Sequence, residues 1–286
     1  MRDSGYFKSG QEQLYYAVHL PGAHGKPGEG IIFIHAGGGN RFGPHRMFVE
    51  FAESLSDKYV CVRFDLSGCG DSSGVCQEGT TSHQDDIISA VHYFRQRYQL
   101  NRVYLMGISR GAYLIYQILT NNEMPVGGAV LLSCPVSSRK AAIGTFSMRL
   151  KGYGLKLFEI RSWKKLIIGR VNIRYVIHSL RLALSLNRRY SPEFNPEGKN
   201  GTDCPMLFVY GQHDPICAVS MGFYQRDCQQ RGITWKRHVI PFANHSFFHY
   251  HWKDQLYLVL KKWLHSHRSG YVENSGKGVV NAIISE

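Results

Sequence analysis

One serine in this sequence lies between two glycines, in the run Gly107-Ile108-Ser109-Arg110-Gly111, a spacing typical of a catalytic nucleophile. Glycine at both positions lets a buried strand turn sharply into a helix and push the serine up on a strained backbone. The apolar run 103–106 before the serine and the helix-forming run 112–119 after it fit such a turn. Because the pattern also occurs by chance, its chemical partners have to be sought elsewhere in the chain.

Two later residues could activate this serine, which is a poor nucleophile without a base and an acid that orients the base. Asp214 closely follows the apolar strand predicted at 206–210, and His245 follows the strand predicted at 234–240. The carboxyl ends of parallel strands lie at one edge of a sheet, which would bring both side chains to Ser109. We predict Ser109 as the nucleophile, His245 as the base and Asp214 as the orienting acid.

Other readings of these positions exist. Asp214 lies in a His-Asp-Pro run, which is also ordinary turn chemistry. Three further histidines compete for the role of base. His213 adjoins the acid and would need a different loop geometry, whereas His249 and His251 fall within the predicted last helix. We therefore favour His245.

The oxyanion that forms when a serine attacks a carbonyl needs two hydrogen-bond donors. The backbone N–H of Arg110, at the start of a predicted helix, is the first candidate. The second comes from the loop Ala36-Gly37-Gly38-Gly39, with Gly37 favoured and Gly38 as the competitor. The same glycines could cradle a phosphate, but the loop lacks both the G-x-G-x-x-G spacing and a P-loop lysine, which argues against a nucleotide site.

Strands and helices alternate along the chain, as the positions of these residues require. Strands are predicted at 12–20 (paired with 6–7), 31–35, 59–64, 103–106, 128–133, 206–210 and 234–240, and helices from about 44 and at 83–97, 112–119, 218–230 and 247–264. Repeated β-α-β units predict the α/β class, with a mostly parallel central sheet and helices on both faces. We expect residues 1–136 and 202–267 to form this core, 137–201 an inserted helical cap, and 268–286 a C-terminal tail.

The net charge of +13 belongs to one segment, because residues 136–190 hold 13 Lys or Arg and one acid while the rest of the chain carries +1. This predicts a basic cap that attracts an anionic partner: an acyl carrier protein, a coenzyme A ester or a phospholipid surface. In the cap, Ile173 and Ile177 share the apolar face of a predicted helix and are candidate substrate-binding residues; alternatively, that face only packs the cap onto the core. Without a helix-turn-helix, zinc or RNA-binding pattern, nucleic acid is not expected as a partner.

The seven cysteines are scattered and contain no C-x-x-C pair. They predict unpaired core residues in a reducing compartment, and neither a metal nor an organic cofactor is expected.

No signal peptide is visible, and no apolar run is long enough to cross a membrane. We therefore expect a cytoplasmic protein, with the cap as the part that would contact a membrane surface.

Taken together, these motifs resemble a known group of enzymes. The residues that carry the resemblance are His35-Ala36-Gly37-Gly38, Asp65-Leu66-Ser67-Gly68-Cys69-Gly70-Asp71-Ser72, Gly107 to Gly111, Asp214 and His245. They are similar to those of the α/β-hydrolase superfamily, over about residues 12–265. The resemblance implies the α/β-hydrolase fold and a Ser-Asp-His triad.

Within that superfamily, residues 40–46, 63–65 and the basic stretch 163–174 resemble the exosortase-associated hydrolases of bacteria. Ala36 departs from the glycine that many relatives carry, but alanine is small enough for the loop to be kept. His35, which begins this loop, is a further candidate for substrate binding. The narrower resemblance does not supply a substrate.

The residues and the resemblance predict a serine hydrolase that cleaves a carboxylic ester or thioester through an acyl-enzyme on Ser109. An acyltransferase that passes the acyl group to an alcohol or amine would use the same three residues, so the sequence leaves both reactions open. A non-catalytic binding protein on a hydrolase scaffold is the more distant alternative. Such proteins often lack the nucleophile or the base, and both are present here.

Overall fold

A computed structural model describes residues 2–22, 28–74, 82–121, 124–136 and 202–267. An eight-stranded sheet forms its centre, in the order β1-β2-β4-β3-β5-β6-β7-β8. Strands β1 and β2 form an antiparallel hairpin, and β2 pairs antiparallel with β4. The pairs from β4 through β3, β5, β6 and β7 to β8 are all parallel. The α/β class and the mostly parallel sheet are thus confirmed.

The elements follow the predicted alternation closely. The strands are β1 (Arg2–Ser9), β2 (Glu12–His19), β3 (Glu29–Ile34), β4 (Val60–Phe64), β5 (Arg102–Ile108), β6 (Gly128–Leu132), β7 (Met206–Gly211) and β8 (Trp235–Ile240). The helices are the 3-10 turn η1 (Pro44–Arg46), then α1 (Met47–Leu55), α2 (Ser82–Arg97), α3 (Arg110–Asn121), α7 (Cys217–Arg231) and α8 (Tyr250–Ser266). Every residue of β3, β4, β6 and β7 is buried, as expected for strands covered on both faces.

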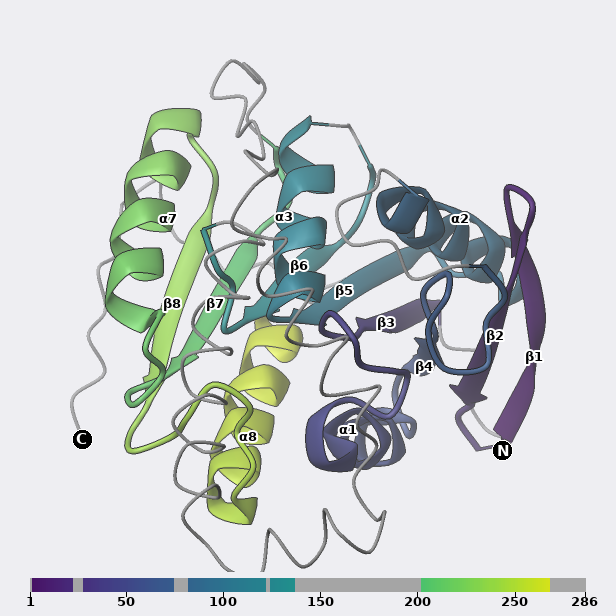
Figure 1. The fold of residues 1–286 in the computed structure, drawn as a ribbon, viewed down its shortest axis with the longest axis horizontal. Coiled ribbons are helices and arrows are strands. Elements are labelled where there is room, and N and C mark those ends of the chain that lie inside the picture. The colour runs from purple at the N-terminus through teal and green to yellow at the C-terminus, as the bar shows by residue number, and fades with distance from the viewer. Residues whose placement is uncertain (1, 23–27, 75–81, 122–123, 137–201, 268–286) are drawn as a thin grey trace, which may run out of the picture.

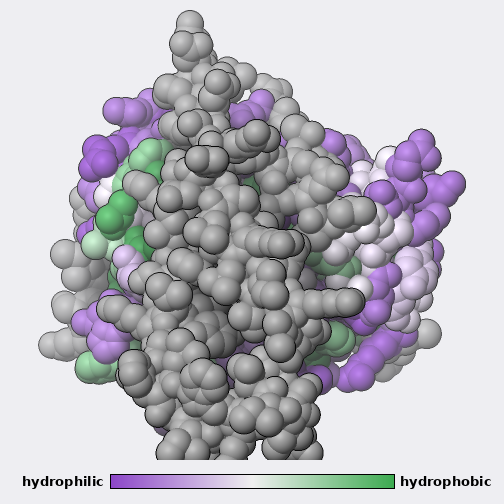
Figure 2. Space-filling view, viewed as in Figure 1, coloured by the Kyte–Doolittle hydropathy of each residue, from purple (hydrophilic) through white to green (hydrophobic). Residues whose placement is uncertain are grey.

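The sheet separates two apolar clusters, one under each layer of helices (Figure 1). Helices α2, α3 and α7 cover one face, and α1 and α8 cover the other. Alternate residues of one strand therefore belong to different clusters, as Ile32 and Phe33 of β3 do. Hydrophilic and intermediate side chains cover the edge formed by β1 and β2 (Figure 2), which suits a sheet edge that faces water.

Two helices begin later than the apolar pattern predicts. The chain passes through η1 before α1 starts, and His45 and Arg46 adopt positive φ angles of 50° and 60° there. Before α8, Phe247 has φ 49° and His249 is extended, so the helix starts at Tyr250. Periodicity places apolar side chains on a face but does not report such local turns, so the expected starts near 44 and at 247 were too early.

Several predictions fall on residues that the structure does not describe. They include the cap at 137–201, with Ile173 and Ile177, and the tail at 268–286. All of the described cysteines except Cys217 are buried. Among the described helices, none combines the length and apolar character needed to cross a bilayer. Within the same ranges, no cluster of His, Cys, Asp and Glu side chains could hold a metal ion.

Candidate active site

Ser109 lies at a sharp turn between β5 and α3 and has a φ of 52°, which is rare for a residue other than glycine. The two glycines beside it are required by space. A Cβ on Gly107 would lie 2.7 Å from the backbone nitrogen of Ala112, and one on Gly111 would lie 2.5 Å from the carbonyl oxygen of His35. The glycine-flanked motif therefore describes a real packing constraint between the turn, α3 and β3.

The structure brings the three predicted catalytic residues together. His245 Nε2 lies 3.1 Å from Ser109 Oγ, and His245 Nδ1 lies 2.9 Å from Asp214 Oδ2. Because a carboxylate only accepts, Nδ1 carries a proton toward Asp214, which leaves Nε2 free to accept the serine proton. Ser109 and Asp214 are buried, whereas His245 stays partly accessible. These side chains arrive from the carboxyl ends of β5, β7 and β8, the edge that the sequence predicts.

Main-chain contacts hold the acid and the base in place. The Ile216 N–H donates to Asp214 Oδ1 at 3.1 Å, which fixes the carboxylate in its turn. The Ser133 hydroxyl donates to the carbonyl oxygen of His245 at 3.0 Å. Ser133 follows β6 directly and has a positive φ of 45°. Sequence analysis missed this positioning residue, although a polar residue after an apolar strand at the same edge was a signal.

The competing histidines lie elsewhere. His213 is exposed and its ring contacts Phe242. His249 precedes α8 in an extended conformation, so it is not within the last helix as predicted, and His251 is exposed on the first turn of α8. None of the three forms a hydrogen bond to Ser109 or Asp214 among the described residues.

The two predicted oxyanion segments adjoin each other. Arg110 is the first residue of α3, and a Cβ on Gly37 would lie 3.1 Å from Arg110 Cδ. Gly38 has a φ of 67°, and the Gly39 N–H donates to the Ala36 carbonyl at 3.0 Å, which closes a tight turn. A side chain on Gly37 would thus crowd the start of the helix where an oxyanion is expected.

His35 has a structural role that differs from the substrate contact we expected. Its ring is 1% exposed. Nδ1 donates to the Ala36 carbonyl at 2.8 Å, and Nε2 accepts from the Leu66 N–H at 3.1 Å. Both ring nitrogens are therefore engaged by the main chain. We assign His35 to tying the glycine-rich loop to the loop after β4 rather than to binding substrate.

Acid should destabilise the fold through His35. Burial lowers the pKa of His35 to about 4 from its usual 6.5, and the Ala36 carbonyl opposes this shift only in part. Between these two pH values the unfolded chain binds a proton at residue 35 and the folded chain does not. The contribution of His35 to the free energy of unfolding is therefore complete above pH 6.5 and is lost as the pH drops toward 4. The shift corresponds to about 3 kcal/mol.

Urea unfolding at a series of pH values would measure this loss. We expect the free energy of unfolding of the variant His35→Gln to depend less on pH across that window than the wild type, even if it starts lower at neutral pH. His251→Gln, at an exposed histidine, is the matched control and should keep the wild-type slope. An unchanged slope in His35→Gln would assign the acid sensitivity to other groups, such as His19, whose pKa burial also lowers to about 4.

A buried carboxylate organises the loops beside the glycine-rich turn. Asp65 is fully buried at the end of β4 and accepts hydrogen bonds from the Arg41 N–H at 2.6 Å, the Arg41 guanidinium and the Asp71 N–H at 3.0 Å. Arg41 also pairs with Asp71 at 2.7 Å and lies over the Tyr15 ring. These residues fix the path of the chain from the glycine-rich loop to α1.

The sequence from residue 31 to 257, which contains all three catalytic candidates, matches the family described as the alpha/beta hydrolase family. The chain belongs to this family. No curated protein matches the hydrolase at a significant level.

Solved structures share its fold over nearly the whole chain. An esterase of Pyrococcus furiosus is 15% identical, with a TM-score of 0.70 over 93% of this chain and 91% of its own. Est1E of Butyrivibrio proteoclasticus, with ferulic acid bound, is 16% identical, with a TM-score of 0.63 over 92% and 98%. A proline iminopeptidase of Mycobacterium smegmatis is 16% identical, with a TM-score of 0.61 over 93% and 98%. At these identities the likeness concerns the fold of the hydrolase.

Proposed function

We propose that this hydrolase cleaves a carboxylic ester or thioester through an acyl-enzyme on Ser109. The observation that carries the proposal is the relay from Ser109 Oγ through His245 to Asp214, with separations of 3.1 and 2.9 Å. The strained turn at Ser109 and the adjoining start of α3 support it, because backbone N–H groups at the first turn of a helix are suited to stabilising an oxyanion.

The reaction has two steps. Ser109 Oγ attacks the carbonyl carbon while His245 Nε2 takes the hydroxyl proton, and the Asp214 carboxylate stabilises the imidazolium. The tetrahedral intermediate collapses, the bond from carbon to the leaving oxygen or sulfur breaks, and His245 gives its proton to the leaving group. Water, deprotonated by His245, then attacks the acyl-enzyme and releases the acid. In this scheme the N–H groups of Arg110 and Gly37, or Gly38 in its place, stabilise the oxyanion in both steps.

The described residues favour an apolar acyl group. Phe242 and Phe248 are 66% and 50% exposed on the segment between β8 and α8 that also carries His245. Exposed aromatic side chains on the same segment as the base would suit an apolar substrate group. For the leaving group, the basic stretch 136–190 leads us to propose an anionic carrier, a coenzyme A ester or a phospholipid surface. The likeness to exosortase-associated hydrolases, and a cytoplasmic location, remain predictions.

The proposal is tested by mass and by product. A fluorophosphonate probe should add one equivalent of mass to the wild type and none to a variant without the Ser109 hydroxyl. Absence of an adduct on the wild type would contradict catalysis and favour a binding protein. Hydrolysis of p-nitrophenyl esters of graded chain length, beside acyl-coenzyme A thioesters, would define the substrate. Acyl products that appear only with added alcohols or amines would instead indicate an acyltransferase.

A further inference from the structure

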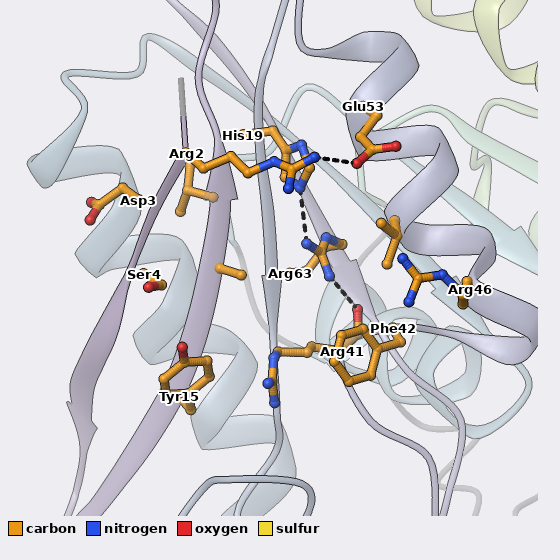
Figure 3. Close-up of a pocket in the computed structure, with 13 residues that line it drawn as sticks. Arg2, Asp3, Ser4, Tyr15, His19, Arg41, Phe42, Arg46, Glu53 and Arg63 are labelled. Atoms are coloured by element: carbon orange, nitrogen blue, oxygen red, sulfur yellow. Dashed lines mark hydrogen bonds and ion pairs between the residues drawn. The ribbon is translucent and has the colours of Figure 1, made fainter.

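A pocket of about 320 Å³ lies between the β1–β2 hairpin, β4, α1 and the loop before α1 (Figure 3). None of Ser109, Asp214 and His245 lines it. Four arginines do: Arg2, Arg41, Arg46 and Arg63. The acids in its lining, Asp3 and Glu53, already have cationic partners in Arg97 and Arg2. We call this space the arginine pocket.

Arg63 is a buried cation that forms no ion pair with a described residue. It is 5% exposed and lies inside β4, where all its neighbours along the strand are apolar. Its guanidinium donates to His19 Nε2 at 2.9 Å and to the Arg41 carbonyl at 3.3 Å, and both acceptors are neutral. Its Nε finds no hydrogen-bond partner among the described residues. No described carboxylate forms an ion pair with Arg63, although a buried unpaired charge is costly.

The other arginines of the pocket differ in whether they have anionic partners. Arg41 is occupied by Asp65 and Asp71. Arg46 is exposed and forms no ion pair with a described residue. Burial and the nearby Arg41 lower the pKa of Arg63 to about 10, so the group is still charged at neutral pH. Arg46 and Arg63 are therefore the two arginines of this pocket that form no ion pair with a described residue.

The backbone beside the pocket is strained in a way that favours a ligand site. His45 and Arg46 both adopt left-handed φ angles, 50° and 60°, immediately before α1. Two consecutive non-glycine residues in this region cost free energy, and such strain is commonly found at ligand-binding segments. The hydroxyl groups of Ser4 and Tyr15 add further polar groups to the lining.

We propose that the arginine pocket binds the phosphate group of a small phosphate monoester, with Arg63 and Arg46 as its counter-charges. A phosphate group at neutral pH carries close to two negative charges and several acceptor oxygens, which fits two unpaired guanidinium groups better than a carboxylate does. The volume leaves room for the organic part of the ester. This site is separate from the acyl chemistry, and it stands whether or not Ser109 is catalytic.

Calorimetric titration in low-salt buffer tests the site, with inorganic phosphate, glycerol 3-phosphate and acetate as probes. We expect phosphate to bind the wild type and to raise its Tm by about 5 °C at a hundredfold excess over Kd. Arg63→Met should weaken phosphate binding by about 10- to 100-fold. Arg226→Met, at an exposed arginine outside the pocket, is the control and should bind like the wild type.

A merely structural role for Arg63 gives a different result. Under the proposal, Arg63→Met removes a buried charge that has no ion pair among the described residues, so its Tm without phosphate equals or exceeds that of the wild type. If that variant fails to fold, Arg46→Gln still tests the proposal. It alters an exposed residue and should weaken phosphate binding several-fold. Tighter binding of glycerol 3-phosphate than of phosphate would assign the site to an ester, and the reverse to free phosphate. Equal phosphate responses in the wild type and in both variants, or tighter binding of acetate, would overturn the proposal.

Discussion

Ser109→Ala should lower kcat for the best ester substrate by roughly four to six orders of magnitude. The change removes the attacking oxygen, and His245 then has no proton to take from residue 109. KM should change little, because the substrate pocket keeps its shape. The Tm should stay within about 2 °C of the wild type, since only one small polar atom is lost.

Steady-state kinetics with a p-nitrophenyl ester would measure this loss, provided that the variant is purified from cells free of other esterases. Ser54→Ala, at an exposed serine on α1, is the matched control and should retain full activity. A Ser109→Ala enzyme that keeps more than about a hundredth of the wild-type rate would show that another group attacks the substrate. The relay geometry would then be an accident of packing.

Asp214→Asn should be the next most damaging change, with kcat reduced about 10⁴-fold. The amide is nearly the same size as the carboxylate, so the fold is kept. An amide that turns its NH₂ toward His245 Nδ1 makes that nitrogen accept, which moves the proton to Nε2 and blocks it as a base. An amide that turns its oxygen there restores the tautomer but does not stabilise the imidazolium that forms during the reaction.

Kinetics and labelling together separate these effects. Asp214→Asn should still react with a fluorophosphonate, only more slowly, because the Ser109 hydroxyl is intact. Asp57→Asn, at an exposed aspartate, should leave both rates unchanged. If Asp214→Asn kept the wild-type kcat, Asp214 would have no catalytic role. It would only stabilise the turn in which it accepts a hydrogen bond from the Ile216 N–H.

Much of this fold and site could be predicted from the sequence, for a physical reason. Strands that are buried on both faces appear in the sequence as short apolar runs. The residues just after such strands lie at one edge of the sheet when the strands are parallel. That rule predicted Asp214 and His245 beside Ser109, although His245 lies 136 positions after the serine. The glycines of the turn were equally readable, because Gly107 and Gly111 pack against backbone atoms that leave no room for a side chain.

What could not be predicted depends on contacts between distant segments. His35 is one example, because its ring connects two loops by hydrogen bonds to the Ala36 carbonyl and the Leu66 N–H. The arginine pocket is lined by residues from β1, β4 and the start of α1, and no local sequence pattern predicts that these segments come together. One signal was available in the sequence. Arg63 interrupts the apolar run of β4, and a buried charge at such a position is costly unless an anionic group pairs with it.

The β6–β7 pairing has an evolutionary consequence. Ala129 is registered against Met206 and Leu132 against Val209, so the strands that come before and after residues 137–201 are neighbours in the sheet. The closure entropy of a connecting segment rises only slowly with its length. Natural selection can therefore lengthen, shorten or rewrite this connection while the scaffold for Ser109, Asp214 and His245 stays in register. Changes in the length of this connection therefore need not alter the chemistry of the three residues.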